Sequence, residues 1–198
     1  MNKQKFQKSL QSLSSWRERA FIVSLAERAL PNAKLYLGSL NEEIPSELDA
    51  IVEAIWQHLI IDPDEAEIIN LLDEVIAHLP ETIESDSYGV IPTMDCLTLL
   101  EQALLSGVNE EKRRAFDASQ SSVNTIIQFI EFSEGEGLSE NELIKLFDSH
   151  PLVAREFSFQ SEVNDLLRSA THPGEALIIE LRELAQDEGI SNIGISLT

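Results

Sequence analysis

Residues 45–60, PSELDAIVEAIWQHLI, contain the clearest structural signal in the chain. Their apolar side chains recur at intervals of three and four residues, at Leu48, Ile51, Val52, Ile55, Trp56, Leu59 and Ile60. Polar residues, among them Asp49, Glu53 and Gln57, fall on the opposite side of the same helical wheel. A period near 3.6 residues is typical of an amphipathic helix with one face on a core. The segment therefore predicts a helix whose apolar face is buried.

Helix-start signals lie on both sides of this segment. Three pairs have the spacing of a capping box, in which two side chains satisfy the first free N–H groups of a helix: Ser15 with Glu18, Asp62 with Glu65, and Ser139 with Glu142. A short helix is expected before the first box, over 5–13. Pro31 should end or bend the helix that follows Ser15, because proline has no N–H to donate.

Later starts are marked by Pro92, Asn109, Pro151 and Pro173. The helix after Asp62 should run to about His78. The spacing predicts that it buries Ile68, Ile69, Leu72, Val75 and Ile76. In the helix after Pro151 the predicted buried residues are Val153, Phe157, Val163, Leu166 and Leu167.

These segments predict an all-α fold, a compact bundle of about eight to nine helices. Residues 190–198, ISNIGISLT, lack helical periodicity and predict a short extended C-terminal tail. The sequence EGEG at 134–137 could separate two lobes, but four residues are also an ordinary connection between helices. We expect a single helical domain over residues 1–198.

Charge is distributed unevenly along this acidic chain, whose formal net charge is -21. Residues 1–34 contain seven basic and two acidic residues, whereas residues 35–111 contain eighteen acidic residues and neither Lys nor Arg. The carboxylates of this acidic middle must face water, a cation or basic groups from elsewhere. We favour the interpretation that the basic N-terminal helices pack beside it and the remaining charge is solvated. A face that docks a basic protein partner is the alternative.

The same charge argues against two classes of partner. Nucleic-acid binding draws its affinity from Lys and Arg at phosphates, so no nucleic acid is expected. Anionic membrane surfaces attract basic segments, and no apolar run approaches the length of a membrane span, so no membrane association is expected. The polar N-terminus does not resemble a secretory signal, and Cys96 is the only cysteine. These features favour a cytoplasmic protein.

No residue pattern indicates a catalytic, cofactor or metal site. The four histidines are scattered, and there is no HExxH, no phosphate-binding glycine loop and no dinucleotide fingerprint. The most unusual segment is ESDSYGVIPTMD at 84–95, a candidate functional loop through Asp86, Tyr88, Gly89 and Asp95. Its simpler interpretation, which we favour, is a turn followed by a helix start.

Several separated motifs give the chain a resemblance to a known family. They are SSW at 14–16, ERALPN at 27–32, IW at 55–56, YGV at 88–90 and SNIGI at 191–195, with Phe21, Leu25, Asp86, Pro92, Asp95, Pro151, Glu156 and Gln160 between them. In these residues the chain resembles the YjaG-like family of uncharacterised bacterial proteins, a domain of unknown function. The resemblance implies a bacterial cytoplasmic protein and supplies no activity, cofactor or catalytic residue.

Three functional hypotheses remain open. The first, which we favour, is a non-enzymatic protein-interaction domain with an acidic face. The second is an enzyme or metal-binding protein that gathers carboxylates such as Asp86, Asp95 and Glu101. The third is a homo-oligomeric structural protein in which the basic arm of one copy reaches the acidic middle of another.

Overall fold

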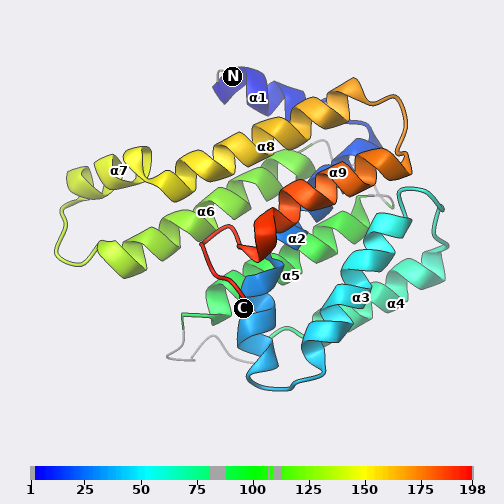
Figure 1. Ribbon diagram of the computed structural model, residues 1–198, viewed down its shortest axis with the longest axis horizontal. Helices are drawn as coiled ribbons and strands as arrows, with labels where there is room; N and C mark the ends of the chain where they lie inside the picture. Colours follow the sequence, from blue (N-terminus) through cyan, green and yellow to red (C-terminus); the bar gives the residue numbers. More distant parts are fainter. Residues whose placement is uncertain (1–2, 81–87, 107, 109–112, 198) are drawn as a thin grey trace.

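The computed structural model describes residues 3–80, 88–106, 108 and 113–197. These residues form nine α-helices and one short 3₁₀ helix, η1, in an all-α fold (Figure 1). The helices are α1 (Lys3–Leu10), α2 (Ser15–Gly38), α3 (Ile44–Gln57), α4 (Glu65–Ala77), α5 (Val90–Leu105), α6 (Arg114–Glu134), α7 (Glu140–Ser149), α8 (Pro151–Ser169) and α9 (Glu175–Gln186), followed by η1 (Asp187–Gly189). The predicted fold class is confirmed.

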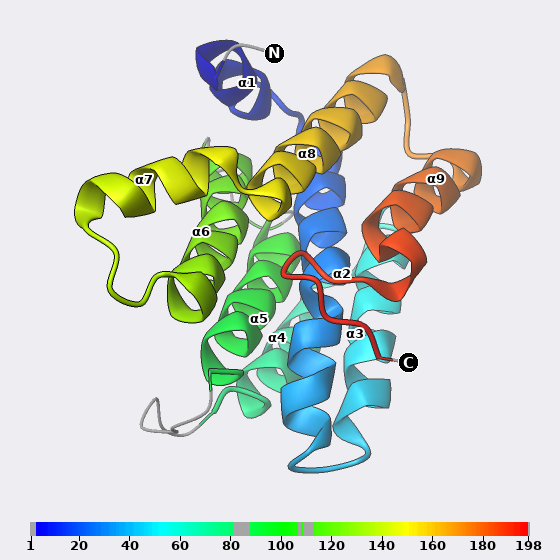
Figure 2. The ribbon, with the colours of Figure 1, turned by 60° about the vertical axis from the view of Figure 1, so that its left-hand side comes forward.

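Helix α2 forms the centre of the fold, and α3, α5, α6, α8 and α9 all pack against it (Figure 2). Every residue from Arg19 to Leu30 is buried, whether apolar or charged. A helix that is enclosed on all sides in this way needs partners for its polar side chains. The charged and amide residues of the 27–32 motif find these partners on α3, α8, α9 and the C-terminal tail.

Pro31 lies inside α2 and does not end it, which corrects one of the two predicted outcomes. The helix continues to Gly38 because Ala33 and Leu37 are buried beyond the proline and continue the packed face. Pro31 leaves the Glu27 carbonyl without its helical donor. The neighbouring Arg28 carbonyl accepts a hydrogen bond from the Asn192 N–H at 3.3 Å, so the C-terminal tail docks at this point.

The predicted helix at 45–60 is α3, and six of its seven apolar residues are buried. Leu59 and Ile60 both follow the end of α3 at Gln57, and of these two Leu59 is buried and Ile60 is exposed. In α4 only Ile68 and Val75 are buried. Ile69 and Ile76 are exposed and Leu72 is half-buried, because only one face of this peripheral helix is covered.

Helix caps agree with the sequence in part. The capping box of Ser139 and Glu142 is present. Helix α2 is instead preceded by Ser14, whose side chain does not cap it. Asp64, not Asp62, caps α4 by accepting from the Glu67 N–H. Asn109 lies outside the described residues.

The C-terminal tail lacks helix, as predicted, but it is not extended throughout, because residues 191–194 form a turn that folds the chain back (Figure 1). Its only pairing in the described part of the chain is an isolated antiparallel bridge between Ile190 and Ser196. Gly194 turns the tail through a positive φ of 85°. Among the described helices, none is both long enough and apolar enough to cross a bilayer.

Candidate functional site

The residues of the candidate loop do not assemble into a reactive centre. Asp86 lies outside the described residues. The Tyr88 ring stacks on Phe132, with centroids 4.4 Å apart, and makes a tilted contact with Phe129. Gly89 brings the backbone so close to Tyr36 that an added Cβ would lie 2.9 Å from its ring. These contacts fix the segment against α2 and α6.

Asp95 lies on α5 and is half-buried. Burial raises the pKa of its carboxyl group, and the hydrogen bond that the Thr125 hydroxyl donates at 2.6 Å opposes the rise. Glu101 follows six residues later, so the two side chains are about 9 Å apart along the helix axis and leave it in different directions. Asp95 and Glu101, two of the carboxylates named as examples for the enzyme hypothesis, therefore do not lie side by side on α5.

Cys96 is fully buried, and its thiol donates weakly to the Ala26 carbonyl. Burial, with the neighbouring Asp95 charge, raises the pKa of this thiol to about 12, so it is not a thiolate at neutral pH. Within the described residues, no three His, Cys, Asp or Glu side chains are close enough to hold a metal ion.

Helix α8 buries a polar stripe. Glu156, Gln160 and Asn164 recur every fourth residue, so they share one face, and all three are almost completely inaccessible. Glu156 pairs with Arg28 of α2 at 3.2 Å and accepts from the Ser122 hydroxyl of α6. Gln160 bonds to Ser119, and Asn164 accepts from Ser9 of α1. This polar stripe fixes which face of α8 points inward.

The outward face of α8 consequently carries a large apolar residue. Phe157 follows Glu156 and lies about 100° around the helix from it. Its side chain is 40% exposed, which corrects the prediction that it is buried. Phe159 occupies the core position instead, where the Arg28 guanidinium lies 4.4 Å from its ring centroid.

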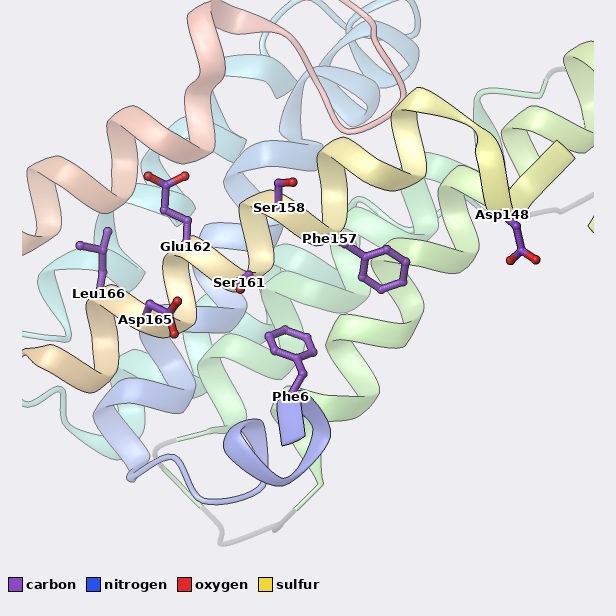
Figure 3. A pocket seen from close by; sticks show the side chains of 8 residues that line it. All are labelled: Phe6, Asp148, Phe157, Ser158, Ser161, Glu162, Asp165 and Leu166. Atoms are coloured by element: carbon purple, nitrogen blue, oxygen red, sulfur yellow. The ribbon is translucent and has the colours of Figure 1, made fainter. Parts of the chain in front are cut away.

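Phe157 lines a groove of about 990 Å³ that runs along α8 between α1 and α7. Figure 3 shows the ring of Phe157 facing that of Phe6 from α1, with Asp148 toward the α7 end. We call this the α1–α8 groove. Its lining residues are Phe6, Asp148, Phe157, Ser158, Ser161, Glu162, Asp165 and Leu166.

The groove combines an apolar surface with uncompensated negative charge. Among the described side chains, its lining contains three carboxylates, Asp148, Glu162 and Asp165, and no basic group. All three are exposed, and none forms an ion pair with another described residue. A cationic ligand therefore meets unpaired charge here.

Several carboxylates of the acidic middle are in a different situation, because they are paired within the chain. Lys34 pairs with Asp49, and Arg182 of α9 pairs with Glu53. His58 and His78 contact Glu67 and Glu47. The expectation of basic N-terminal partners is met by Lys34, while the other partners come from α9 and from the middle itself.

Sequence reasoning did not find the α1–α8 groove, because the spacing of Phe157 with Val153 resembles a core stripe. One sequence signal could have shown which face of α8 is buried. Glu156, Gln160 and Asn164 repeat every fourth residue, and the first two belong to the motifs that carry the family resemblance. A polar stripe of this kind is compatible with a buried face when other helices supply partners.

Comparison with known proteins identifies the relatives of the chain. A family model described as "Protein of unknown function (DUF416)" matches residues 5–196. An uncharacterized protein of Haemophilus influenzae is 32% identical over 193 residues, covering 95% of each chain. The uncharacterized protein YjaG of Escherichia coli is 27% identical and covers 94% of this chain, with 93% of its own length matched.

A solved structure has the same fold. It is the crystal structure of a DUF416 family protein from Shewanella baltica, which superposes with a TM-score of 0.85 at 25% sequence identity. The match covers 97% of this chain and 98% of the other. The all-α architecture is therefore shared along nearly the whole length.

Proposed function

The chain belongs to the DUF416 family of proteins of unknown function, which supplies no activity to carry over. We propose that this protein is a non-enzymatic interaction module that binds a basic amphipathic segment in the α1–α8 groove. One observation carries the proposal. The α1–α8 groove has aromatic side chains from two helices and three carboxylates without partners in the described chain.

Charge complementarity selects the occupant. An apolar segment alone would leave Asp148, Glu162 and Asp165 unpaired, whereas Lys or Arg beside the apolar anchors would pair with them. A helix that inserts its apolar face into a groove, with charged residues at the rim, is a common mode of peptide recognition. Phe6 and Phe157 are the expected contacts for the apolar anchors.

Two features make the α1–α8 groove a better candidate than the acidic middle. Part of the charge of the middle is neutralised by Lys34 and Arg182. The groove also offers exposed aromatic surface beside its carboxylates, and aromatic residues dominate binding energy at interfaces. The acidic middle remains the alternative face for the same partner.

Homo-oligomerisation through the basic arm is the other alternative. In this structure α1 packs on its own chain, where Leu10 is buried and the Ser9 hydroxyl donates to Asn164 at 2.9 Å. These contacts occupy the inner face of α1. They favour a separate partner in the groove over a second copy reached by this arm.

The test uses a fluorescent helical peptide of about 14 residues, roughly four turns, built only from Leu and Lys in an amphipathic repeat. Fluorescence anisotropy measures its binding to the full chain, and a Leu–Glu peptide of equal length is the negative control. We expect the Leu–Lys peptide to bind and the Leu–Glu peptide not to bind. Affinity should fall steeply as salt rises, because the screening length is about 10 Å at 0.1 M.

Two charge-reversal variants locate the site. One replaces Asp148, Glu162 and Asp165 with Lys, and its matched control replaces Glu42, Glu43 and Glu47 with Lys. Both change the net charge equally and alter only exposed residues. Binding should be lost in the groove variant and retained in the control.

Loss only in the control would place the docking face on the acidic middle and contradict the groove. Equal loss in both variants would show an effect of net charge alone. Light scattering of the free protein gives an independent check. A mass that rises with concentration and falls in the groove variant would identify a second copy as the occupant.

A further inference from the structure

A second cavity shares no lining residue with the α1–α8 groove. It lies between the C-terminal end of α2, the start of α5, the C-terminal half of α6 and the tail. Its volume is about 360 Å³, which is within the range of small-molecule sites. The cavity is lined by Asn32, Leu35, Tyr36, Ser39, Tyr88, Gly89, Pro92, Phe129, Ile193 and Ile195. We call it the tyrosine cavity.

The tyrosine cavity gathers motifs that lie far apart in the sequence. Asn32 belongs to the 27–32 motif, and Tyr88 and Gly89 belong to the candidate loop. Ile193 and Ile195 belong to the 191–195 motif. These are segments on which the family resemblance rests. The candidate loop thus has a place in the structure, as one wall of a cavity and not as a catalytic turn.

Two polar groups of the wall lack hydrogen-bond partners in the described chain. Asn32 is 3% exposed. Its Nδ2 donates to Asn192 Oδ1 at 2.8 Å, but its own Oδ1, which can only accept, receives no bond. The buried Tyr88 hydroxyl also has no partner. Buried polar groups are nearly always paired, and two of the five unpartnered buried atoms of the described side chains belong to residues that line this one cavity.

The chemistry of the wall limits the kind of ligand. Among the described residues, no Asp, Glu, Lys, Arg or His lines the cavity, so a charged ligand would lose its hydration without gaining a partner from them. Burial, and secondarily the Asp95 charge, raises the pKa of Tyr88 to about 12, so this side chain stays a neutral phenol. Tyr36, Tyr88 and Phe129 provide rings for edge or face contacts with an aromatic molecule.

We infer that the tyrosine cavity binds a small, uncharged aromatic molecule that carries an N–H donor. The donor bonds to Asn32 Oδ1, and the Tyr88 hydroxyl bonds to a second polar atom of the ligand. The rings of Tyr36 and Phe129 contact its aromatic body. This site is independent of the basic segment proposed for the α1–α8 groove.

Benzamide is a suitable probe because it is uncharged and aromatic and has both an N–H donor and a carbonyl acceptor. Methyl benzoate has a similar shape but no donor. Titration of the full chain, followed by protein NMR, should show saturable binding of benzamide with shifts at Tyr88 and the tail. Methyl benzoate should bind several-fold more weakly. Absence of saturable benzamide binding would overturn the inference, and equal affinities would overturn the role of Asn32.

Three variants test the location. Tyr88→Phe removes only the unpaired hydroxyl, so it should keep or raise the melting temperature while weakening benzamide about threefold to tenfold. Ser39→Trp should fill the cavity from its exposed rim and abolish binding. Leu40→Trp, the adjacent exposed position outside the lining, is its control and should bind like the wild type. Equal binding by the two Trp variants would place the benzamide elsewhere.

Discussion

Replacing Arg28 with Met tests the buried pair that holds α8 against α2. The side chains of Arg28 and Glu156 are 2% and 0% exposed, so the variant leaves a carboxylate in the interior without its cation. Breaking a buried pair in this way costs about 3–5 kcal/mol. The Ser122 hydroxyl and the Gln160 amide still donate to Glu156, which places the expected cost near the lower limit.

A loss of about 3 kcal/mol corresponds to a fall of about 6–12 °C in melting temperature for a chain of this size. Urea unfolding at neutral pH, followed by circular dichroism, measures the change in free energy. Arg113→Met is the matched control, because Arg113 forms an exposed pair with Asp117. It should cost less than about 1 kcal/mol.

The double variant Arg28→Met/Glu156→Gln removes both charges and retains the amide hydrogen bonds. We expect it to be more stable than Arg28→Met alone, with a coupling energy of about 1–3 kcal/mol. The single variant Glu156→Gln completes the comparison. If the losses of free energy in Arg28→Met and in Glu156→Gln simply add in the double variant, the uncompensated charge of Glu156 does not cause the instability. The account of the polar stripe would then be wrong.

Further predictions concern the groove, a buried carboxyl group, a cap and metal ions. Phe157→Ala should weaken the Leu–Lys peptide about tenfold or more but barely change the unfolding free energy, since the ring is exposed; unchanged anisotropy titrations would count against it. Asp95 has a raised folded-state pKa, so its ionisation destabilises the fold as pH rises. Asp95→Asn should therefore gain stability relative to the wild type as the pH rises above about 4 in urea titrations, and a constant difference would contradict this. Ser139→Ala should cost about 0.5–2 kcal/mol through loss of the capping box, measured in the same way. Zinc, calcium or magnesium should give no saturable rise in melting temperature, and such a rise for one ion would reveal a site.

Much of the fold could be predicted because most helices follow the ordinary rule of apolar faces inward. Leu48, Ile51 and Trp56 were recognisable from spacing alone. The rule fails in α8, where Glu156, Gln160 and Asn164 are buried and Phe157 is exposed. Their burial depends on Arg28, Ser119 and Ser122 from other helices, and such long-range partners are not visible in local spacing.

The errors in α4 and α2 have related causes. Ile69 and Ile76 match a helical stripe, but α4 lies at the periphery and only part of its apolar surface is covered. Pro31 is tolerated inside α2 because tertiary packing outweighs local propensity. Two residues of the candidate loop, Tyr88 and Gly89, line the tyrosine cavity. Its other walls include segments more than 100 residues away in the sequence, and spacing within one segment cannot show that these segments meet.

The docking of Asn192 on α2 has a consequence for the order of events during synthesis. Ribosomes release the chain from its N-terminus, so α2 emerges long before the residue that bonds to the Arg28 carbonyl and to the Asn32 side chain. Until then the most enclosed helix of the protein has open polar groups beside its proline. The native packing of α2 around Pro31 is therefore completed only after Asn192 has been synthesised, and a nascent chain stalled before residue 190 should lack the two hydrogen bonds of Asn192 at this point of the helix.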